Sequence, residues 1–296
     1  MHSTVPFAVW SRERQQRIEE VLSDALDDRT MIAPARLREA MRYAVLGGGK
    51  RVRSLLAYGA AEAVGADPAD VDTAAAAVEM IHAYSLVHDD LPCMDDDAVR
   101  RGKPSCHVAF GEATALLAGD ALQTQAFALI AQSRLDDRAA ACALLAEAAG
   151  ASGMAGGQAI DLDATGHALD LSALTAMHRM KTGAMIRASV QLGARAAKQP
   201  TADADAALDA YAAAIGLAFQ IVDDILDVEG TTSSIGKTAG KDAANDKPTF
   251  VSLLGAAEAR ARAETLRTEA HGALKMFGDR GTRLSEIADW IVVRRS

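Results

Sequence analysis

The chain has 296 residues, and its 40 acidic residues outnumber its 31 basic residues to give a formal net charge of −9. Half of the residues are hydrophobic, which excludes a globally disordered chain, and the acidic balance argues against a general nucleic-acid-binding protein. Only 4% of the residues are aromatic and alanine is used heavily, a composition that favours helices over sheets.

The sequence also indicates where in the cell the protein is expected. The N-terminus has no basic segment followed by a long apolar one, so we expect no signal peptide. The longest uncharged stretches, such as 121–133 and 210–222, are shorter than the roughly 18–20 residues that a membrane span needs. Cys93, Cys106 and Cys142 form neither a disulfide framework nor a metal-binding pair. We therefore expect a cytoplasmic protein with reduced thiols.

Along the chain, apolar residues recur at helical spacing, first around 122–130 and again over 205–228. No segment shows sustained two-residue alternation, and no shift of composition marks a domain boundary. Breakers separate the apolar segments at 47–49, Pro92, 102–104, Gly166, 199–201 and 230–247. We expect a single all-α domain over residues 1–296, built from roughly ten helices.

Two aspartate clusters each end a strongly apolar helical segment. The first, at 88–97, reads His-Asp-Asp-Leu-Pro-Cys-Met-Asp-Asp-Asp. Its proline must distort the helix, so Asp95 can return toward Asp89 only through an irregular turn. In the second cluster, Asp223 and Asp227 are four residues apart and share one helix face.

Carboxylates at this spacing repel one another, which favours neutralisation by a bound cation. Oxygen ligands without cysteine pairs indicate Mg²⁺ or Mn²⁺ rather than zinc, and the spacing of an EF-hand is missing. Either cluster alone is typical of a solvated acidic loop or a helix cap, but the occurrence of two favours a metal site.

Six of the eight lysines lie in breaker segments or beside these motifs: Lys50, Lys103, Lys181, Lys237, Lys241 and Lys247. Cations gathered around acidic metal sites indicate a polyanionic ligand. Residues 47–53, Gly-Gly-Gly-Lys-Arg-Val-Arg, offer backbone amides and three cations to a diphosphate, although alone such a run is typical of a flexible basic turn. The spacing of a Walker loop is absent.

These motifs, in this order, resemble the trans-isoprenyl diphosphate synthases, and among them the bacterial farnesyl diphosphate synthases. The resemblance covers most of the chain. It rests on residues 46–53, on Asp89-Asp90-x4-Asp95 followed by Arg100-Arg101-Gly102, on 119–122, on Gly157-Gln158-x2-Asp161, on Lys181-Thr182-Gly183 and on Asp223-Asp224-x2-Asp227. It implies an all-α bundle around a deep cavity, normally a homodimer.

The implied reaction joins dimethylallyl or geranyl diphosphate head-to-tail to isopentenyl diphosphate, giving farnesyl diphosphate. By resemblance, Asp89, Asp95 and Asp223 would ligate Mg²⁺, three ions per active site with Mn²⁺ as an alternative. Asp90, Asp224 and Asp227 would support them, and Lys181 and Lys237 would complete the catalytic set. Contacts with the allylic diphosphate are implied for Arg100, Lys181, Thr182, Gln220, Lys237 and Lys247, and contacts with isopentenyl diphosphate for Lys50, Arg53, His82 and Arg101.

Product length is expected to depend on cavity depth. The resemblance associates Tyr84, five residues before Asp89, with a C15 product, although helix phase alone does not place it on the cavity wall. Two residues depart from the family pattern: Ser54 replaces a frequent proline, and Ala98 shortens the acidic run. A geranylgeranyl diphosphate synthase and a non-catalytic subunit that binds metal and diphosphate remain as alternatives, whereas a terpene cyclase fits the second motif less well.

Overall fold

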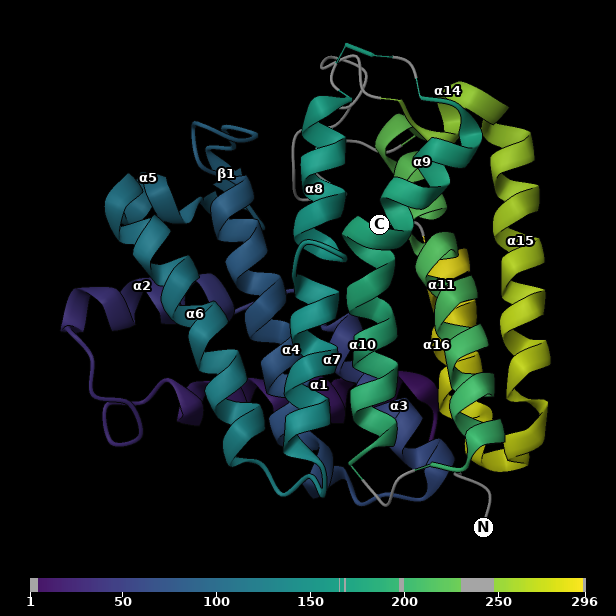
Figure 1. The fold of residues 1–296 in the computed structure, drawn as a ribbon, viewed down its shortest axis with the longest axis horizontal. Helices are drawn as coiled ribbons and strands as arrows, with labels where there is room; N and C mark the ends of the chain where they lie inside the picture. Colours follow the sequence, from purple (N-terminus) through teal and green to yellow (C-terminus); the bar gives the residue numbers. More distant parts are fainter. Residues whose placement is uncertain (1–4, 165, 168, 197–199, 230–247, 295–296) are drawn as a thin grey trace.

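The computed structural model describes residues 5–164, 166–167, 169–196, 200–229 and 248–294, and this part of the chain is almost entirely helical (Figure 1). The all-α fold class is therefore confirmed. The N-terminal half holds α1 (Phe7–Ala25), α2 (Ala35–Val45), α3 (Val52–Val64), α4 (Pro68–Asp89), α5 (Cys106–Phe110), α6 (Glu112–Gln132) and α7 (Arg138–Ala149). It is followed by α8 (Met154–Asp163), α9 (Leu171–His178), the π-helical turn η1 (Arg179–Gly183), α10 (Ala184–Ala194), α11 (Ala202–Glu229), α14 (Phe250–Leu254), α15 (Ala256–Ala273), the 3₁₀ segment η2 (Leu274–Gly281) and α16 (Thr282–Val293).

The described helices are more numerous and often shorter than the roughly ten expected, because short helices such as α5 and α14 form directly after the predicted breakers at 102–104 and 230–247. The only sheet in the described residues is a hairpin of β1 (Val99–Arg100) and β2 (Lys103–Pro104), which the sequence did not predict. Strands of two residues are too short to give a two-residue hydrophobic alternation. The predicted breaker at 102–104 lies at the turn of this hairpin.

Helix α4 forms the middle of the core. Asp67 caps its N-terminus by accepting from the Ala69 amide at 2.8 Å, and Pro68 occupies the first helical position, where no intrahelical N–H bond is lost. The run Ala74–Val78 is fully buried, so α4 is enclosed on nearly all sides and shows little amphipathic pattern. It packs against α3, α6 and α10.

Helix α11 is the second central helix. It packs against α10, α15 and α16, and its predicted apolar stripe is buried, including Leu208, Tyr211 and Ile215. Because α10 packs against both α4 and α11, it connects the two helices that carry the aspartate clusters. Both clusters lie at C-terminal ends, and the figure shows α4 and α11 running toward the same end of the bundle (Figure 1).

By length and composition alone, two described stretches could cross a membrane: Arg138–Asp163 and α11. The first is divided between α7 and α8 by an irregular segment at 150–153. The second supplies much of the core, and this packing accounts for its apolar composition.

Candidate active site

A cavity of about 930 Å³ opens where α4 and α11 end. Its wall is built from the glycine-rich loop (residues 47–53), α4, the first aspartate cluster, the β-hairpin, α8, η1, α11 and the segment that begins α14. Most of the residues predicted for the site line it: Lys50, Arg53, His82, Tyr84, Asp89, Asp95, Arg100, Arg101, Lys181, Thr182, Gln220, Asp223 and Asp224. Lys237, Lys241 and Lys247 lie outside the described residues.

The first aspartate cluster turns back on itself as the position of Pro92 predicted. Helix α4 ends at Asp89, and the Asp95 amide donates to the Asp89 carbonyl at 2.9 Å. The Asp97 amide donates to the Asp90 carbonyl at 3.1 Å. The turn therefore brings Asp95 back beside Asp89 at the cavity wall.

Burial and the neighbouring Asp95 carboxylate raise the pKa of Asp89 to about 6, although the positive charge of Lys181 opposes this shift. A cation placed beside Asp89 would therefore stabilise its ionised carboxylate more strongly than it would stabilise an ordinary surface carboxylate.

Asp90 differs from Asp89 in its surroundings. It is 2% exposed, does not line the cavity, and pairs with the Arg100 guanidinium, whose Nε donates to Asp90 Oδ1 at 3.0 Å. Arg100 itself does line the cavity. Asp90 therefore positions Arg100, which lines the cavity, and does not itself face the cavity as Asp89 does.

In the second cluster, Asp223 faces a residue that the sequence interpretation missed. Arg294 Nη2 donates to Asp223 Oδ1 at 2.5 Å and to the Phe219 carbonyl at 3.1 Å, and its guanidinium stacks 4.1 Å from the Phe219 ring centroid. Both Asp223 and Arg294 line the cavity. The available signal was the basic run that begins at 294, directly after the apolar end of α16.

Asp224 makes contacts of a different kind. Its Oδ1 accepts from Gln220 Nε2 and its Oδ2 from the Phe250 amide, both at 2.8 Å, and the residue is 2% exposed. Asp224 thereby fixes the start of α14 against α11. Asp227 is buried and does not line the cavity.

A third group of side chains comes from α8 and η1. Lys181 Nζ lies 2.6 Å from Asp161 Oδ2, and Thr182 Oγ1 donates to Gln220 Oε1 at 3.1 Å. A Cβ at Gly157 would collide with the Lys181 backbone, so glycine permits this close approach of α8 to η1. The sequence motifs contained Asp161, but they did not reveal its ion pair with Lys181.

Two polar side chains in this wall lack partners among the described residues. The two side-chain polar atoms of Gln158 and both ring nitrogens of His178 are buried without hydrogen bonds. Burial above all, and the nearby Lys181 charge, lower the pKa of His178 to about 4, which keeps its ring neutral. Sequence reasoning singled out neither residue for a role.

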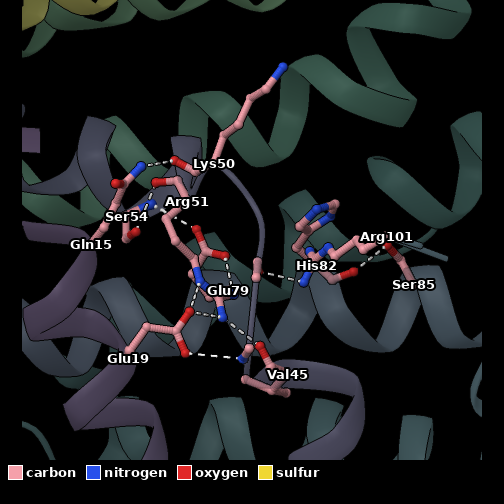
Figure 2. Close-up of polar contacts among 12 residues, drawn as sticks. Gln15, Glu19, Val45, Lys50, Arg51, Ser54, Glu79, His82, Ser85 and Arg101 are labelled. Carbon is pink, nitrogen blue, oxygen red and sulfur yellow. Dashed lines mark hydrogen bonds and ion pairs between the residues drawn. The ribbon is translucent and has the colours of Figure 1, made fainter. Parts of the chain in front are cut away.

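Lys50, Arg53, His82 and Arg101 all line the same cavity. Figure 2 shows His82 beside Arg101, with the Lys50 side chain extending in another direction. Burial and four surrounding arginines hold the pKa of His82 well below its usual value. The buried Nε of Arg53 has no hydrogen-bond partner among the described residues. Arg101 Nη1 donates to the Gly48 carbonyl at 2.8 Å, and a Cβ at Gly49, where φ is 104°, would press on the Arg101 guanidinium.

Tyr84 lines the cavity and is 8% exposed, although helix phase alone did not place it there. Its ring meets the His88 ring edge-on, with centroids 5.7 Å apart. His88 Nε2 lies 3.0 Å from the Leu116 carbonyl, so the pair connects α4 to α6.

Among the described residues, no three histidine, cysteine, aspartate or glutamate side chains gather closely enough to hold a metal ion by themselves. This arrangement nevertheless fits magnesium, which keeps several waters and is bound through one or two carboxylates together with substrate phosphates. The aspartate side chains that line the cavity offer carboxylate oxygens as metal ligands. A bound cation would also lower the raised pKa of Asp89.

A family model described as polyprenyl synthetase matches residues 34–275. The farnesyl diphosphate synthase of Escherichia coli (strain K12) is 49% identical over 264 residues, which cover 86% of this chain and 88% of that protein. An FPP/GFPP synthase structure from Zymomonas mobilis has a TM-score of 0.84 and 39% identity, covering 97% of this chain and 99% of that one. A geranyltransferase from Helicobacter pylori, complexed with magnesium and isoprenyl diphosphate, has a TM-score of 0.85 and 33% identity over 98% of both chains. The chain therefore belongs to the polyprenyl synthetase family.

Proposed function

We propose that this chain is a short-chain trans-prenyltransferase that condenses dimethylallyl diphosphate, and then geranyl diphosphate, with isopentenyl diphosphate to make farnesyl diphosphate. The observation that carries this proposal is one cavity whose wall holds two groups of carboxylates together with several cationic side chains. The farnesyl diphosphate synthase of E. coli, which matches most of this chain, supports the C15 product.

Magnesium is the proposed cofactor, at three ions per active site, with manganese as an alternative. Asp89 and Asp95 would hold it on the α4 side and Asp223 on the α11 side, since these carboxylates line the cavity. When bound, it would neutralise the charge that develops on a departing diphosphate. The related H. pylori structure contains magnesium and isoprenyl diphosphate, which supports this assignment.

The allylic diphosphate is assigned to the side of the cavity lined by both aspartate groups. Lys181 and Arg100 would stabilise the negative charge as the allylic C–O bond breaks, and Thr182 and Gln220, already hydrogen bonded to each other, would orient the diphosphate. Lys237 and Lys247 belong to the same proposed set. Asp90 and Asp224 act on this site indirectly, through Arg100 and through Gln220 and α14.

Isopentenyl diphosphate is assigned to Lys50, Arg53, His82 and Arg101, which line the same cavity. The Arg53 guanidinium carries several N–H donors, and its Nε has no hydrogen-bond partner among the described residues, so Arg53 can donate to an anionic oxygen in the cavity. Neutral His82 can also donate one ring N–H without adding charge. Held there, isopentenyl diphosphate would use the electrons of its double bond to form a bond to the allylic cation. The released diphosphate would then accept the proton lost from the new chain.

The cavity wall between these polar groups includes the apolar side chains Leu86, Met94, Met154, Leu162 and Phe219. An apolar wall excludes water, which would otherwise capture the allylic cation. Tyr84 is proposed to close the end of the space that the growing chain occupies.

Three further proposals concern the whole chain. A single prenyl synthase domain over residues 1–296 is supported by one continuous buried cluster that runs from Trp10 to Ile291. A homodimer is supported by exposed apolar residues on α5 and α6, since Val108, Leu116 and Leu117 are about half exposed, at 53%, 47% and 56%. A cytoplasmic location is proposed from the absence of disulfides among the described cysteines.

Purified protein incubated with Mg²⁺, dimethylallyl diphosphate and isopentenyl diphosphate should release farnesyl diphosphate, identified by mass spectrometry. A C20 product would instead establish a geranylgeranyl diphosphate synthase. Release of no prenyl product, with retained binding of diphosphate, would establish the non-catalytic alternative.

Asp89→Ala and Asp223→Ala should each lose about a hundredfold or more in rate because each removes a proposed metal ligand. Asp209→Ala, which removes a carboxylate of α11 that pairs with Arg187 outside the cavity, is the matched control.

A further inference from the structure

The glycine-rich loop contains an arginine whose side chain and backbone are both constrained. Arg51 is 3% exposed, and its φ of 51° places it in the left-handed region at the N-cap of α3. Side chains that carry a Cβ seldom adopt this backbone conformation. Contacts outside the loop must therefore hold Arg51 in place.

Two acidic side chains and one carbonyl surround the Arg51 guanidinium (Figure 2). Nε and Nη2 donate to Glu19 Oε1 at 2.9 and 2.6 Å, and Nη1 donates to Glu79 Oε2 at 3.2 Å. Nη2 also donates to the Val45 carbonyl at 2.5 Å. Glu19 belongs to α1 and Glu79 to α4, so one side chain joins the loop to two helices.

Glu79 also contacts the backbone that follows the loop. It is 2% exposed, and its Oε1 accepts from the Ser54 amide at 3.1 Å while its Oε2 accepts from Arg51. A proline at position 54, which the resemblance leads one to expect, has no N–H and could not make this bond. The departure at Ser54 therefore gives this chain one more bond between α3 and α4.

Lys50 and Arg53, on either side of Arg51, line the cavity, as do Arg51 and Glu79. Figure 2 shows the Lys50 side chain extending away from the Arg51 guanidinium. Gln15 Nε2 donates to the Lys50 carbonyl at 2.9 Å, and Glu19 Oε2 accepts from the Gly47 amide at 3.3 Å. Backbone groups on both sides of the turn are thus bound to α1.

We propose that Arg51 and Glu79 are positioning residues, whose buried ion pair fixes the loop so that Lys50 and Arg53 are presented to the diphosphate of isopentenyl diphosphate. This inference rests on the proposed isopentenyl diphosphate site. Glu79 has a second effect, because its buried negative charge offsets both Arg53 and Arg101 and limits their mutual repulsion, alongside Asp223 near Arg53 and Glu19 near Arg101.

The test compares the Michaelis constants for the two substrates in the full-length enzyme. Glu79→Gln, which keeps the size of the side chain, and Arg51→Met should each raise KM for isopentenyl diphosphate about tenfold, with kcat and the allylic KM changed less than about threefold. Ser54→Pro removes the amide donor to Glu79 and the hydroxyl donor to the Arg51 carbonyl, in the first turn of α3, where proline is tolerated, and should raise the same KM about threefold. Calorimetric binding of isopentenyl diphosphate alone should weaken in parallel.

Asp72→Asn is the matched control. Asp72 also lies on α4 and accepts from an arginine of α1, with Arg17 Nε and Nη2 at 2.7 and 2.6 Å, but it does not contact the glycine-rich loop. This variant should lose stability and leave KM for isopentenyl diphosphate within about twofold of the wild-type value.

The outcomes separate the inference from the site on which it rests. If Lys50→Ala raises KM for isopentenyl diphosphate while Glu79→Gln, Arg51→Met and Ser54→Pro leave it unchanged, the positioning role is wrong and the site stands. An equal rise in both Michaelis constants, or the same rise in Asp72→Asn, would also overturn the positioning role, because it would show that Arg51 and Glu79 only stabilise the fold. If Lys50→Ala changes neither constant, the proposed site itself fails.

Discussion

The Asp223 carboxylate is bound by Arg294, with Oδ1 and Nη2 2.5 Å apart, so a proposed metal ligand of α11 is paired with a cation from the end of α16. The side chain of Arg294 is only 5% exposed. A metal ion that binds Asp223 must therefore compete with a nearby, largely desolvated positive charge.

Replacement of this arginine should strengthen metal binding in the absence of substrate. Arg294→Gln removes the competing charge, and we expect Mn²⁺, followed by electron paramagnetic resonance, to bind about threefold to tenfold more tightly. Arg187→Gln removes an arginine that pairs with Asp209 of the same helix outside the cavity, and should leave Mn²⁺ binding unchanged. Equal Mn²⁺ affinity in Arg294→Gln and the wild type would contradict the competition.

A second prediction concerns product length. Tyr84→Ala opens the part of the cavity wall where the Tyr84 ring meets His88, so products longer than C15 should accumulate. Mass spectrometry of the products measures the shift. Tyr43→Ala, which removes an aromatic ring that packs on Phe110 outside the cavity, should keep the product distribution of the wild type. An unchanged C15 product from Tyr84→Ala would exclude Tyr84 as the floor.

The helical fold could be predicted from local patterns in the sequence, whereas most residues of the cavity wall were expected only from the resemblance to the trans-isoprenyl diphosphate synthases. The stripe over 205–228 became α11, and the distorted turn after Asp89 follows from the chemistry of Pro92. The aspartate and lysine motifs predicted a shared site because clustered like charges repel one another unless opposite charges or a bound ligand neutralise them.

The pairings within the site could not be predicted in the same way. Asp223 and Arg294 are 71 residues apart, and only the packing of α16 beside α11 brings them together. Similarly, nothing local distinguishes Asp89, which faces the cavity, from Asp90, which binds Arg100. Orientation around the end of a helix depends on tertiary contacts that sequence spacing does not contain.

Gly119 of α6 faces His88 of α4 so closely that an added Cβ would collide with the imidazole ring. Gly119→Ala should therefore displace His88 and with it the neighbouring Tyr84, lowering the free energy of unfolding by about 1–3 kcal/mol. Chemical denaturation measures this loss. The double variant Gly119→Ala/His88→Ala should recover most of it, because the second change removes the obstructing ring. Additive losses in the double variant would show that the collision is not the cause.

His178 predicts a pH dependence of stability. Its folded-state pKa of about 4 lies below the ordinary value of 6.5, so the unfolded chain binds the proton more readily. The contribution of His178 is therefore complete above about pH 6.5 and is lost as the pH falls toward 4. Between pH 7 and pH 5 it should lower the free energy of unfolding by about 2 kcal/mol.

His178→Leu should remove this component of the pH dependence while keeping a stability at pH 7 equal to or above that of the wild type, because neither buried ring nitrogen has a hydrogen-bond partner in the part of the chain that the structure describes. Phe250→Leu removes the ring that packs 5.5 Å from His178 but keeps the imidazole, and should retain the loss between pH 7 and pH 5. Urea denaturation at the two pH values measures the difference. If His178→Leu loses as much stability on acidification as the wild type, the acid sensitivity arises from other groups and His178 does not contribute to it.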